Sequence, residues 1–226
     1  MKLLCLFNFL FIFMYKIYGE SFAFYYGNDF KDKSFNFFDN VVVQVENIEE
    51  KIVRENRDKL FAYISLCESD DKNTPKDLII GENKMWNSKI IDLRKQESKD
   101  IVFKKVETAV EKGFINFFFD TLDSYFIVLK REDEIKNYQN SIEDIIKNIK
   151  EKFPSSRIIM NRGFEIMHNL TYYVDYIAAE SLYFGIDYNK NYVKMKSEDT
   201  LWLKEKLNYA KNLGYKVIVI DYLKEN

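Results

Sequence analysis

Short apolar runs alternate along this chain with longer amphipathic stretches, and few folds accept that order. The runs are rich in β-branched and aromatic residues, and they are continuous rather than alternating in polarity. Such runs are typical of parallel strands that are buried on both faces. We therefore predict seven strands, at residues 22–26, 40–45, 61–66, 114–120, 157–161, 176–182 and 216–222.

The stretches between these runs carry helical patterns. Apolar residues recur at helical spacing over 135–149, before Pro154, and over 203–213, where Gly214 follows as a C-terminal cap. Residues 102–110 precede Gly113 in the same way. The repeated order of strand, helix and glycine predicts an α/β fold of the TIM-type (β/α) barrel. A complete eightfold barrel needs about 250 residues. Here the eighth strand is missing, so either the barrel is incomplete or an early segment such as 90–93 replaces that strand.

The N-terminus has the pattern of a secretory signal peptide. Lys2 precedes an apolar run over residues 3–15, and Gly19 is a small residue suited to cleavage. We predict a signal peptide at residues 1–20, one barrel domain at 21–226, and a secreted or periplasmic protein without stable membrane association. An uncleaved N-terminal membrane anchor is the alternative, although the run is short for a membrane span. Removal of the signal would leave Cys67 as the one cysteine, without an internal disulfide.

Two of the predicted strands end in acids, Asp120 and Glu180. Acids at the carboxyl ends of parallel strands are where α/β barrels carry out their chemistry, and strands of equal parity face one cavity. Acids two strands apart lie roughly 9–10 Å from each other at the backbone, so their carboxyl groups can converge to cleave a glycosidic bond. The alternative is that each acid caps a helix or pairs with a surface lysine. Apolar neighbours should favour the protonated form of Glu180, so we assign Glu180 as acid/base and Asp120 as nucleophile or charge stabiliser.

Five short motifs occur in order along the chain: FAFYYG at 22–27, AYISLCE at 62–68, DTLDSY at 120–125, NRGFE at 161–165 and AESL at 179–182. Together they resemble the TIM-barrel domain of glycoside hydrolase family 114, the endo-α-1,4-polygalactosaminidase-like proteins, over about residues 22–222. The resemblance implies a secreted hydrolase of α-1,4-linked, galactosamine-containing polysaccharide. It also implies that Asp120 and Glu180 are the catalytic acids.

Polar and aromatic side chains near strand ends are the candidates for substrate binding. Tyrosines can stack on sugar faces, and an excess of acids suits a cationic amino sugar. For the tyrosines the alternative is core packing, and for Asp123 it is a helix N-cap. The candidates are Tyr26, Asp39, Tyr63, Glu68, Asp123, Tyr125, Asn161, Arg162 and Asp221.

Composition narrows the remaining function classes. The net charge of -2 indicates neither a nucleic acid nor an anionic membrane as partner. His168 is the one histidine and no glycine-rich phosphate loop occurs, so we predict no metal site and no cofactor. The leading hypothesis is a glycosidase with a polysaccharide substrate. The alternatives are a non-catalytic carbohydrate-binding relative that retains the cleft, and a purely structural secreted domain.

Overall fold

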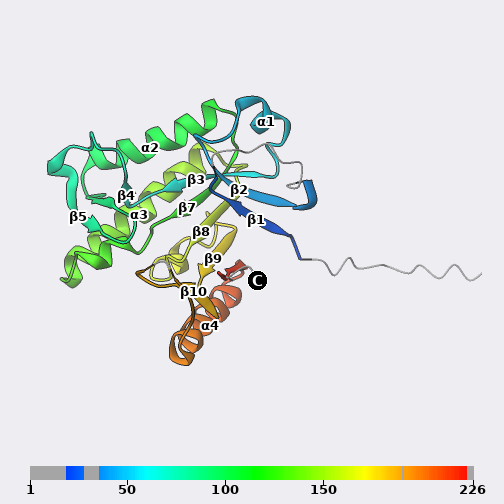
Figure 1. The fold of residues 1–226 in the computed structure, drawn as a ribbon. Helices are drawn as coiled ribbons and strands as arrows, with labels where there is room; N and C mark the ends of the chain where they lie inside the picture. Colours follow the sequence, from blue (N-terminus) through cyan, green and yellow to red (C-terminus); the bar gives the residue numbers. More distant parts are fainter. Residues whose placement is uncertain (1–18, 28–35, 190, 223–226) are drawn as a thin grey trace, which may run out of the picture.

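The computed structural model describes residues 19–27, 36–189 and 191–222. Seven strands form one curled sheet in which every neighbouring pair is parallel (Figure 1). In spatial order they are β1 (Phe22–Tyr25), β2 (Asn40–Gln44), β3 (Leu60–Ser65), β7 (Asn116–Asp120), β8 (Ile158–Asn161), β9 (Tyr176–Glu180) and β12 (Lys216–Ile220). The seven predicted strands and the incomplete TIM-type barrel are therefore confirmed.

Within the described residues, four α-helices accompany the sheet: α1 (Glu50–Glu55), α2 (Gln96–Glu111), α3 (Glu132–Lys152) and α4 (Ser197–Asn212). The three longer ones were predicted, whereas α1 is a short helix that the sequence pattern did not reveal. Gly113 follows α2 and Gly214 follows α4, with φ of 109° and 96°. Glycine adopts this left-handed conformation without steric cost, which is why both helices end there.

Two smaller sheets lie outside the barrel. The antiparallel strands β4 (Glu68–Ser69), β6 (Ser88–Ile91) and β5 (Ile79–Asn83) form one of them, at one side of the molecule (Figure 1). Residues 90–93 therefore do not replace an eighth barrel strand, because β6 pairs with this small sheet instead. The hairpin of β10 (Phe184–Ile186) and β11 (Tyr192–Lys194) follows β9. Short 3-10 helices occupy Lys76–Leu78, Ser124–Ile127 and Met167–Asn169.

The period-two alternation of the strands divides the core into two clusters. One face of the sheet packs against the helices and contains residues such as Phe117, Phe119 and Ile177. The opposite face fills the barrel interior. The interior cluster consists of Val42, Phe61, Phe118, Ile159, Tyr176, Ala178 and Ile218, with Phe22, Phe24, Tyr63 and Ile220 packed against it.

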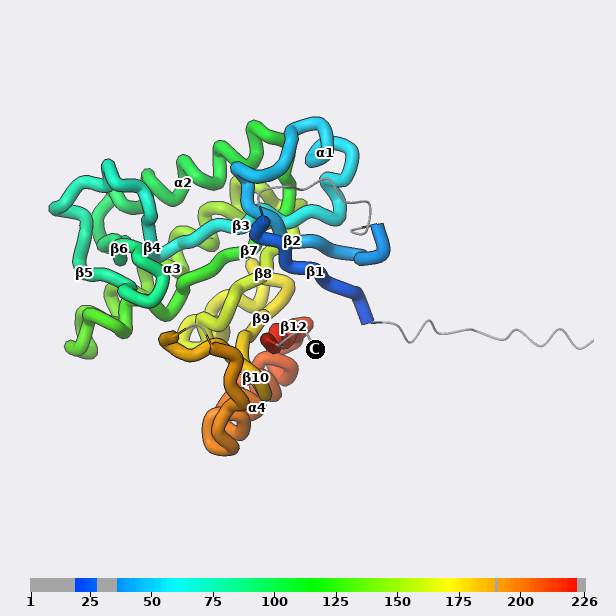
Figure 2. The backbone as a smooth tube through the Cα atoms, in the orientation of Figure 1, coloured from blue at the N-terminus to red at the C-terminus, as the bar shows by residue number. Residues whose placement is uncertain are grey.

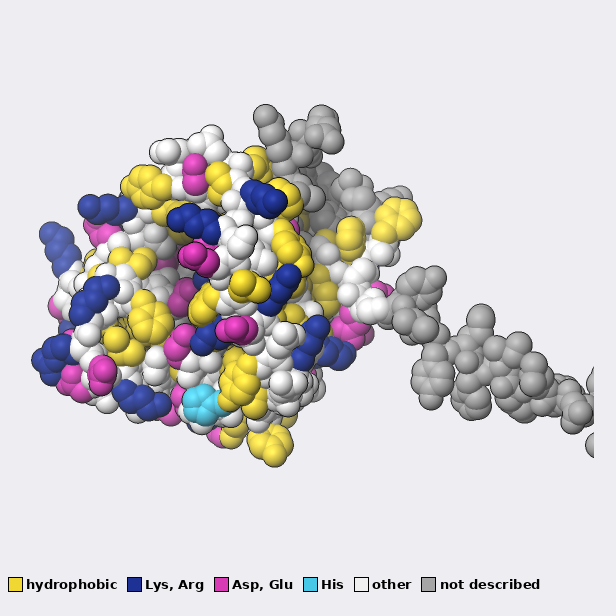
Figure 3. Space-filling view, turned by 90° about the horizontal axis from the view of Figure 1, so that it is seen from below, with side chains coloured by type: hydrophobic (Ala, Val, Ile, Leu, Met, Phe, Trp, Pro, Cys, Tyr) yellow, Lys and Arg dark blue, Asp and Glu magenta, His cyan; other side chains and the backbone are white. Residues whose placement is uncertain are grey.

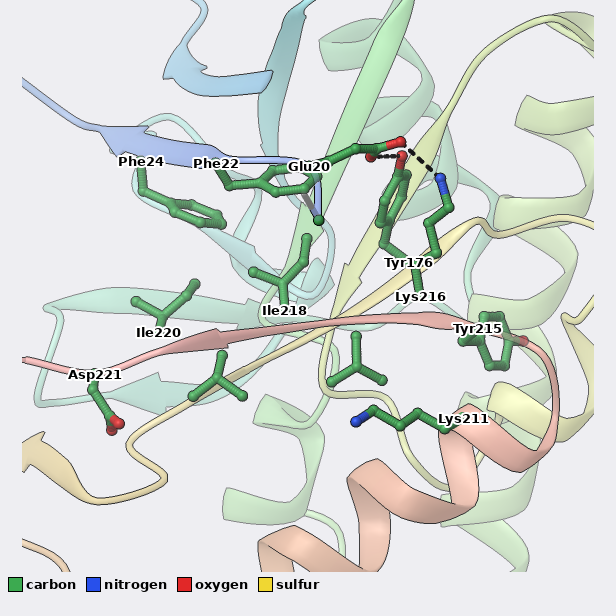
Figure 4. A pocket seen from close by; sticks show the side chains of 13 residues that line it. Glu20, Phe22, Phe24, Tyr176, Lys211, Tyr215, Lys216, Ile218, Ile220 and Asp221 are labelled. Carbon is green, nitrogen blue, oxygen red and sulfur yellow. Dashed lines mark hydrogen bonds and ion pairs between the residues drawn. The ribbon is translucent and has the colours of Figure 1, made fainter. Parts of the chain in front are cut away.

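The sheet has two edges, β1 and β12, which lie opposite each other (Figure 2). A groove of about 870 Å³ lies between them (Figure 4). Phe22 and Phe24 of β1 point toward Ile218 and Ile220 of β12 (Figure 4). No strand lies between these edges among the residues that the structure describes. The groove is therefore the opening that an eighth barrel strand would fill.

Side chains bridge the groove at the end where the strands begin. The Glu20 carboxylate accepts hydrogen bonds from the Tyr176 hydroxyl and from Lys216 Nζ, the latter at 2.7 Å (Figure 4). Glu20 thus belongs to the folded domain, although the sequence pattern assigned it to the signal segment. Residues 1–18 lie outside the described residues, so the signal peptide and its boundary stay predictions. Among the described residues, none of the helices combines the length and apolar character that a membrane span requires.

Candidate active site

Each of the seven strands has, at or close to its end, a polar side chain that continues its inward-facing row toward the carboxyl end of the barrel. The polar residue lies two positions after an apolar residue that belongs to the interior cluster or packs against it, so both point to the same face. The pairs are Phe24 and Tyr26, Val42 and Gln44, Phe61 and Tyr63, Phe118 and Asp120, Ile159 and Asn161, Ala178 and Glu180, and Ile220 and Tyr222. The inward-facing side chains are thus apolar inside the barrel and become polar in the layer at its carboxyl end, which forms the mouth.

Asn161 joins the two predicted catalytic acids. Its Nδ2 donates hydrogen bonds of 2.8 Å to Asp120 Oδ1 and of 2.8 Å to Glu180 Oε1. These two carboxylate oxygens can therefore lie no farther apart than twice that length. In the space-filling view, acidic side chains lie in and around a hollow of the surface (Figure 3).

Two tyrosines complete the contacts of the acids. The Tyr63 hydroxyl donates to Asp120 Oδ2 at 2.6 Å, and the Tyr222 hydroxyl donates to Glu180 Oε2 at 2.5 Å. Tyr26 packs edge-on against Tyr63, with ring centroids 5.3 Å apart. Each acid therefore accepts one hydrogen bond from Asn161 and one from a tyrosine.

The electrostatic environment distinguishes Glu180. Burial raises its pKa above the usual value for glutamate, and the Asp120 charge acts in the same direction. Hydrogen bonds from Tyr222 and Asn161 offset part of this rise. Burial and the nearby acids also raise the pKa of the Tyr63 and Tyr222 hydroxyls, so these tyrosines remain protonated donors. The net effect is a raised pKa of Glu180, with Asp120 beside it.

The backbone turns sharply after Asp120, Asn161 and Glu180. The next residues, Thr121, Arg162 and Ser181, have φ of 65°, 62° and 64°. A left-handed conformation costs a non-glycine residue roughly 1–2 kcal/mol, and more than one neighbouring contact must hold it. The N–H of Arg162 bonds to the carbonyl of Ala178, and that of Ser181 to the carbonyl of Ile220, both at 2.8 Å. Adjacent strands thereby fix the points where the chain leaves the site.

Three further predicted residues lie around the mouth. An Arg162 guanidinium nitrogen is 3.7 Å from the Asp123 carboxylate. Burial raises the pKa of Asp123, although the Arg162 charge acts against this rise. The Asp221 carboxylate accepts hydrogen bonds from the backbone N–H groups of Tyr183 and Phe184 and so holds the β10–β11 hairpin.

Three predicted substrate-binding residues are not brought to the acids. Asp39 precedes β2, at the opposite end of the barrel, and its carboxylate binds Ser21. Glu68 is buried in β4, where its carboxylate accepts hydrogen bonds from protein donors, Ser124 among them. Tyr125 is buried in the core, and its hydroxyl accepts a hydrogen bond from Gln139. The Glu68 carboxylate and the Tyr125 hydroxyl are thus hydrogen-bonded inside the protein, and the Asp39 carboxylate is hydrogen-bonded to Ser21.

We did not predict Tyr222 as a site residue from the sequence. The alternation of the strand could have placed it there, because Ile218, Ile220 and Tyr222 lie on one face at period two. Among the described residues, no group of three or more histidines, cysteines or acids is arranged to hold a metal ion. The arrangement present is a carboxylate pair with hydrogen-bond donors, which is suited to acid–base and nucleophilic chemistry at a sugar.

The sequence profile of glycoside hydrolase family GH114 matches residues 19–226. The chain belongs to this family. It is therefore a glycosidase, and its open barrel carries the two acids that the family resemblance indicated. No curated protein sequence matches the chain.

Several solved structures share the fold of this chain. The glycoside hydrolase domain of PelA from Pseudomonas aeruginosa is 25% identical with a TM-score of 0.83, and the match covers 91% of this chain and 85% of that one. Ega3 from Aspergillus fumigatus, solved as a complex with galactosamine, shares the fold at 12% identity and a TM-score of 0.60, over 90% of this chain and 91% of its own. Trehalose-6-phosphate hydrolase from Bacillus licheniformis shares the fold at 10% identity and a TM-score of 0.57, over 88% of this chain and 56% of its own.

Proposed function

We propose that this glycosidase hydrolyses α-1,4-galactosaminidic bonds of an exopolysaccharide by a retaining mechanism. The observation that carries the mechanism is the bridge through Asn161, whose two bonds of 2.8 Å hold Asp120 and Glu180 close together. Retaining enzymes place their carboxyl groups about 5–5.5 Å apart, whereas inverting enzymes separate them by about 6.5–9.5 Å to admit a water molecule. The bridged pair fits the shorter class.

In the first step, Glu180 donates its proton to the glycosidic oxygen as the bond from that oxygen to the anomeric carbon breaks. Asp120 attacks the anomeric carbon from the opposite face and forms a covalent glycosyl ester. The raised pKa of Glu180 supports its role as the acid, because more of it is protonated near neutral pH. Asn161 and Tyr63 orient the Asp120 carboxylate for attack.

In the second step, Glu180 accepts a proton from water, and the resulting hydroxide attacks the anomeric carbon. The ester bond to Asp120 breaks, Asp120 leaves as a carboxylate, and the released sugar retains its anomeric configuration. Two inversions at one carbon give this outcome.

The choice of sugar rests on charge and on the relatives. Carboxylates of Asp120 and Asp123 lie at the mouth, and a cationic amino sugar complements them. The structure of Ega3 was solved with galactosamine. We further propose that the chain acts outside the cytoplasm, after cleavage of the N-terminal signal peptide at Gly19, which leaves Glu20 in the folded domain.

The test is hydrolysis of a partly deacetylated α-1,4-galactosamine polymer by the purified chain, followed through the release of reducing ends. Glu180→Gln and Asp120→Asn should each lower the rate at least about a hundredfold, the contribution of one acid–base group. Both amides preserve size, so thermal unfolding should stay near wild type. Proton NMR of the first product should show the α-anomer.

A β-anomer as first product would contradict the retaining mechanism but not the catalytic pair. Binding of the polymer without any release of reducing ends would identify a non-catalytic relative instead. Absence of both binding and cleavage would exclude this substrate.

A further inference from the structure

Two polar side chains of the barrel mouth bond neither acid. Tyr26 follows β1 and Gln44 ends β2, and both continue inward-facing rows of their strands. Within residues 19–27, 36–189 and 191–222, neither side chain is hydrogen-bonded or ion-paired to the protein. Polar groups in a folded interior normally have partners, so two adjacent groups without one are candidates for contact with a ligand. We name Tyr26 and Gln44 the mouth pair.

The two acids, in contrast, have a donor on every carboxylate oxygen. Asn161 and Tyr63 bond the oxygens of Asp120, and Asn161 and Tyr222 bond those of Glu180. These contacts hold the acids in place for attack and for proton transfer. The substituents of the sugar therefore need partners elsewhere at the mouth.

The mouth pair lies on the Asp120 side of the site. Gln44 is opposite Tyr63 in the register of β2 and β3, and the Tyr26 ring packs edge-on against the Tyr63 ring at 5.3 Å between centroids. The Tyr63 hydroxyl in turn bonds Asp120 at 2.6 Å. Tyr63 thereby links both members of the pair to the acid that attacks the anomeric carbon in the proposed mechanism.

The Tyr26 hydroxyl combines access with a negative environment. The side chain is 44% exposed, so a ligand can reach it. Burial of its hydroxyl end raises the pKa of Tyr26, and the charges of Asp120 and Glu180 add to this rise. The hydroxyl therefore stays neutral, and the charge of an ionised Asp120 favours a cation beside it.

We propose that the mouth pair binds the ammonium group on C2 of the sugar that Asp120 attacks, and so selects an amino sugar at this position. This proposal rests on the proposed function, because it assigns the pair to the same substrate. Carbon C2 is bonded to the anomeric carbon, so its substituent lies beside the attacking carboxylate. The Tyr26 hydroxyl oxygen and the Gln44 amide oxygen are both acceptors for ammonium N–H groups.

The ring oxygen, the other neighbour of the anomeric carbon, fits the mouth pair less well. Positive charge spreads onto this oxygen in an oxocarbenium-like transition state, so a hydrogen bond donated to it would oppose the reaction. The C2 ammonium group instead carries three donors and no acceptor, and it needs partners that accept. Two neutral acceptors beside Asp120 meet that need.

The experiment compares the double variant Tyr26→Phe/Gln44→Met with Tyr172→Phe as a matched control. The first variant removes a hydroxyl and an amide but retains the ring and the chain length. Tyr172 is 92% exposed and precedes β9, at the end of the strand away from the acids, and its hydroxyl likewise has no hydrogen bond within the described residues. The substrates are an aryl α-galactosaminide and the matching aryl 2-deoxy-α-galactoside, which differ only at C2.

Two ratios are measured: kcat/KM on the galactosaminide relative to the 2-deoxygalactoside, and the affinity for galactosamine relative to 2-deoxygalactose by titration calorimetry. The double variant should lower both ratios by about tenfold, the scale of one hydrogen bond to a charged group. The Tyr172→Phe control should match wild type. If the double variant unfolds, Tyr26→Phe alone replaces it, because this change removes only a hydroxyl without a protein partner.

An equal loss on both substrates would overturn the proposal, because the mouth pair would then serve a group that both sugars share. Ratios equal to those of wild type would overturn it as well. If wild type cleaves neither substrate, the proposed hydrolysis fails, while the titration still decides on the mouth pair. A preference of wild type for galactosamine that the double variant loses would support the proposal, and absence of that preference in wild type would overturn it.

Discussion

The central strands β7, β8 and β9 differ from the edge strands β1 and β12 in how they serve the site. The central strands are buried on both faces, and each ends in a side chain of the bridged group: Asp120, Asn161 or Glu180. The edge strands border the groove and are only partly buried. They contribute Tyr26 and Tyr222, whose hydroxyls surround the acids.

Central strands and edge strands therefore have different roles at the site. Groups that must hold a fixed separation come from strands with a hydrogen-bonded neighbour on each side. Tyr222, whose hydrogen bond lowers the pKa of Glu180, follows a strand with one such neighbour. Changes at central positions should therefore abolish the reaction, whereas changes at edge positions should shift its pH dependence or the stability of the fold.

Loss of Asn161 should have the largest effect of the three changes that follow. Asn161→Ala removes the donor shared by Asp120 and Glu180, so the acids repel each other without a bridge. We expect kcat on the polymer to fall at least about a hundredfold, as for the loss of one preorganised donor in other enzymes.

Asn169→Ala provides the matched control for that change, because Asn169 also donates from Nδ2 to a carboxylate, that of Glu143, at 2.9 Å. This control should retain kcat. A small loss of kcat in Asn161→Ala would contradict the special role of the central strands, because the separation of the two acids would then not depend on the Asn161 bridge.

Tyr222→Phe should have an intermediate effect, about a tenfold loss in kcat/KM, the scale of one hydrogen bond to a charged group. The bond from Tyr222 lowers the pKa of Glu180, so its loss should raise that pKa further. Because the proposed mechanism needs protonated Glu180, the basic limb of the pH–rate profile should move to higher pH.

Tyr209→Phe, on the exposed side of α4, should leave that limb in place. An unmoved limb in Tyr222→Phe would contradict either the acid role of Glu180 or the contact with the edge strand. A loss of activity as large as that of Asn161→Ala would show that residues of the edge strands and of the central strands contribute equally to the reaction.

Glu20→Gln should have the smallest effect, at most about 1 kcal/mol in the free energy of unfolding, because the Glu20–Lys216 pair is partly exposed. Burial alone would raise the pKa of Glu20, but the hydrogen bonds from Lys216 and Tyr176 outweigh it and lower the pKa below 4.5. The stabilisation is therefore present above pH 4.5 and is lost as pH falls through the lowered pKa.

Urea unfolding at neutral and acidic pH measures this difference, and a double-mutant cycle with Lys216→Met isolates the pair. The difference between wild type and Glu20→Gln should shrink on acidification. A difference that is independent of pH would show that the ionised pair does not bridge the groove.

The barrel could be predicted from the sequence because its strands are buried on both faces. Continuous apolar runs such as Phe117–Phe118–Phe119 have no other simple interpretation, and each such run became a strand. The small antiparallel sheets were missed. Strand β4 has two residues and both are polar, so no pattern of hydrophobicity marks it.

Site residues could be predicted where they follow a strand, because the direction of a parallel strand determines which end of the barrel its last residue reaches. Asp120 and Glu180 directly end apolar runs, and the structure brings them together. Asp39 lies next to a run as well, but before it, which puts it at the other end of a parallel barrel. Glu68 follows a run, yet the chain reverses there into β4 and buries the carboxylate. These outcomes depend on the path of the chain after the strand, which composition does not determine.

The side-chain bridge across the groove has a consequence for the order of folding. Glu20 and Lys216 are 196 residues apart in the chain, and Glu20 and Tyr176 are 156 apart. Contacts of such long range form only after most of the intervening chain is in place, and they slow folding. During synthesis or export from the N-terminus, the side chains that bridge the groove cannot meet until β12 emerges. The outer edge of β1 has no strand partner among the described residues, so until the bridge forms beside it this edge is open to pairing with another chain, which favours aggregation.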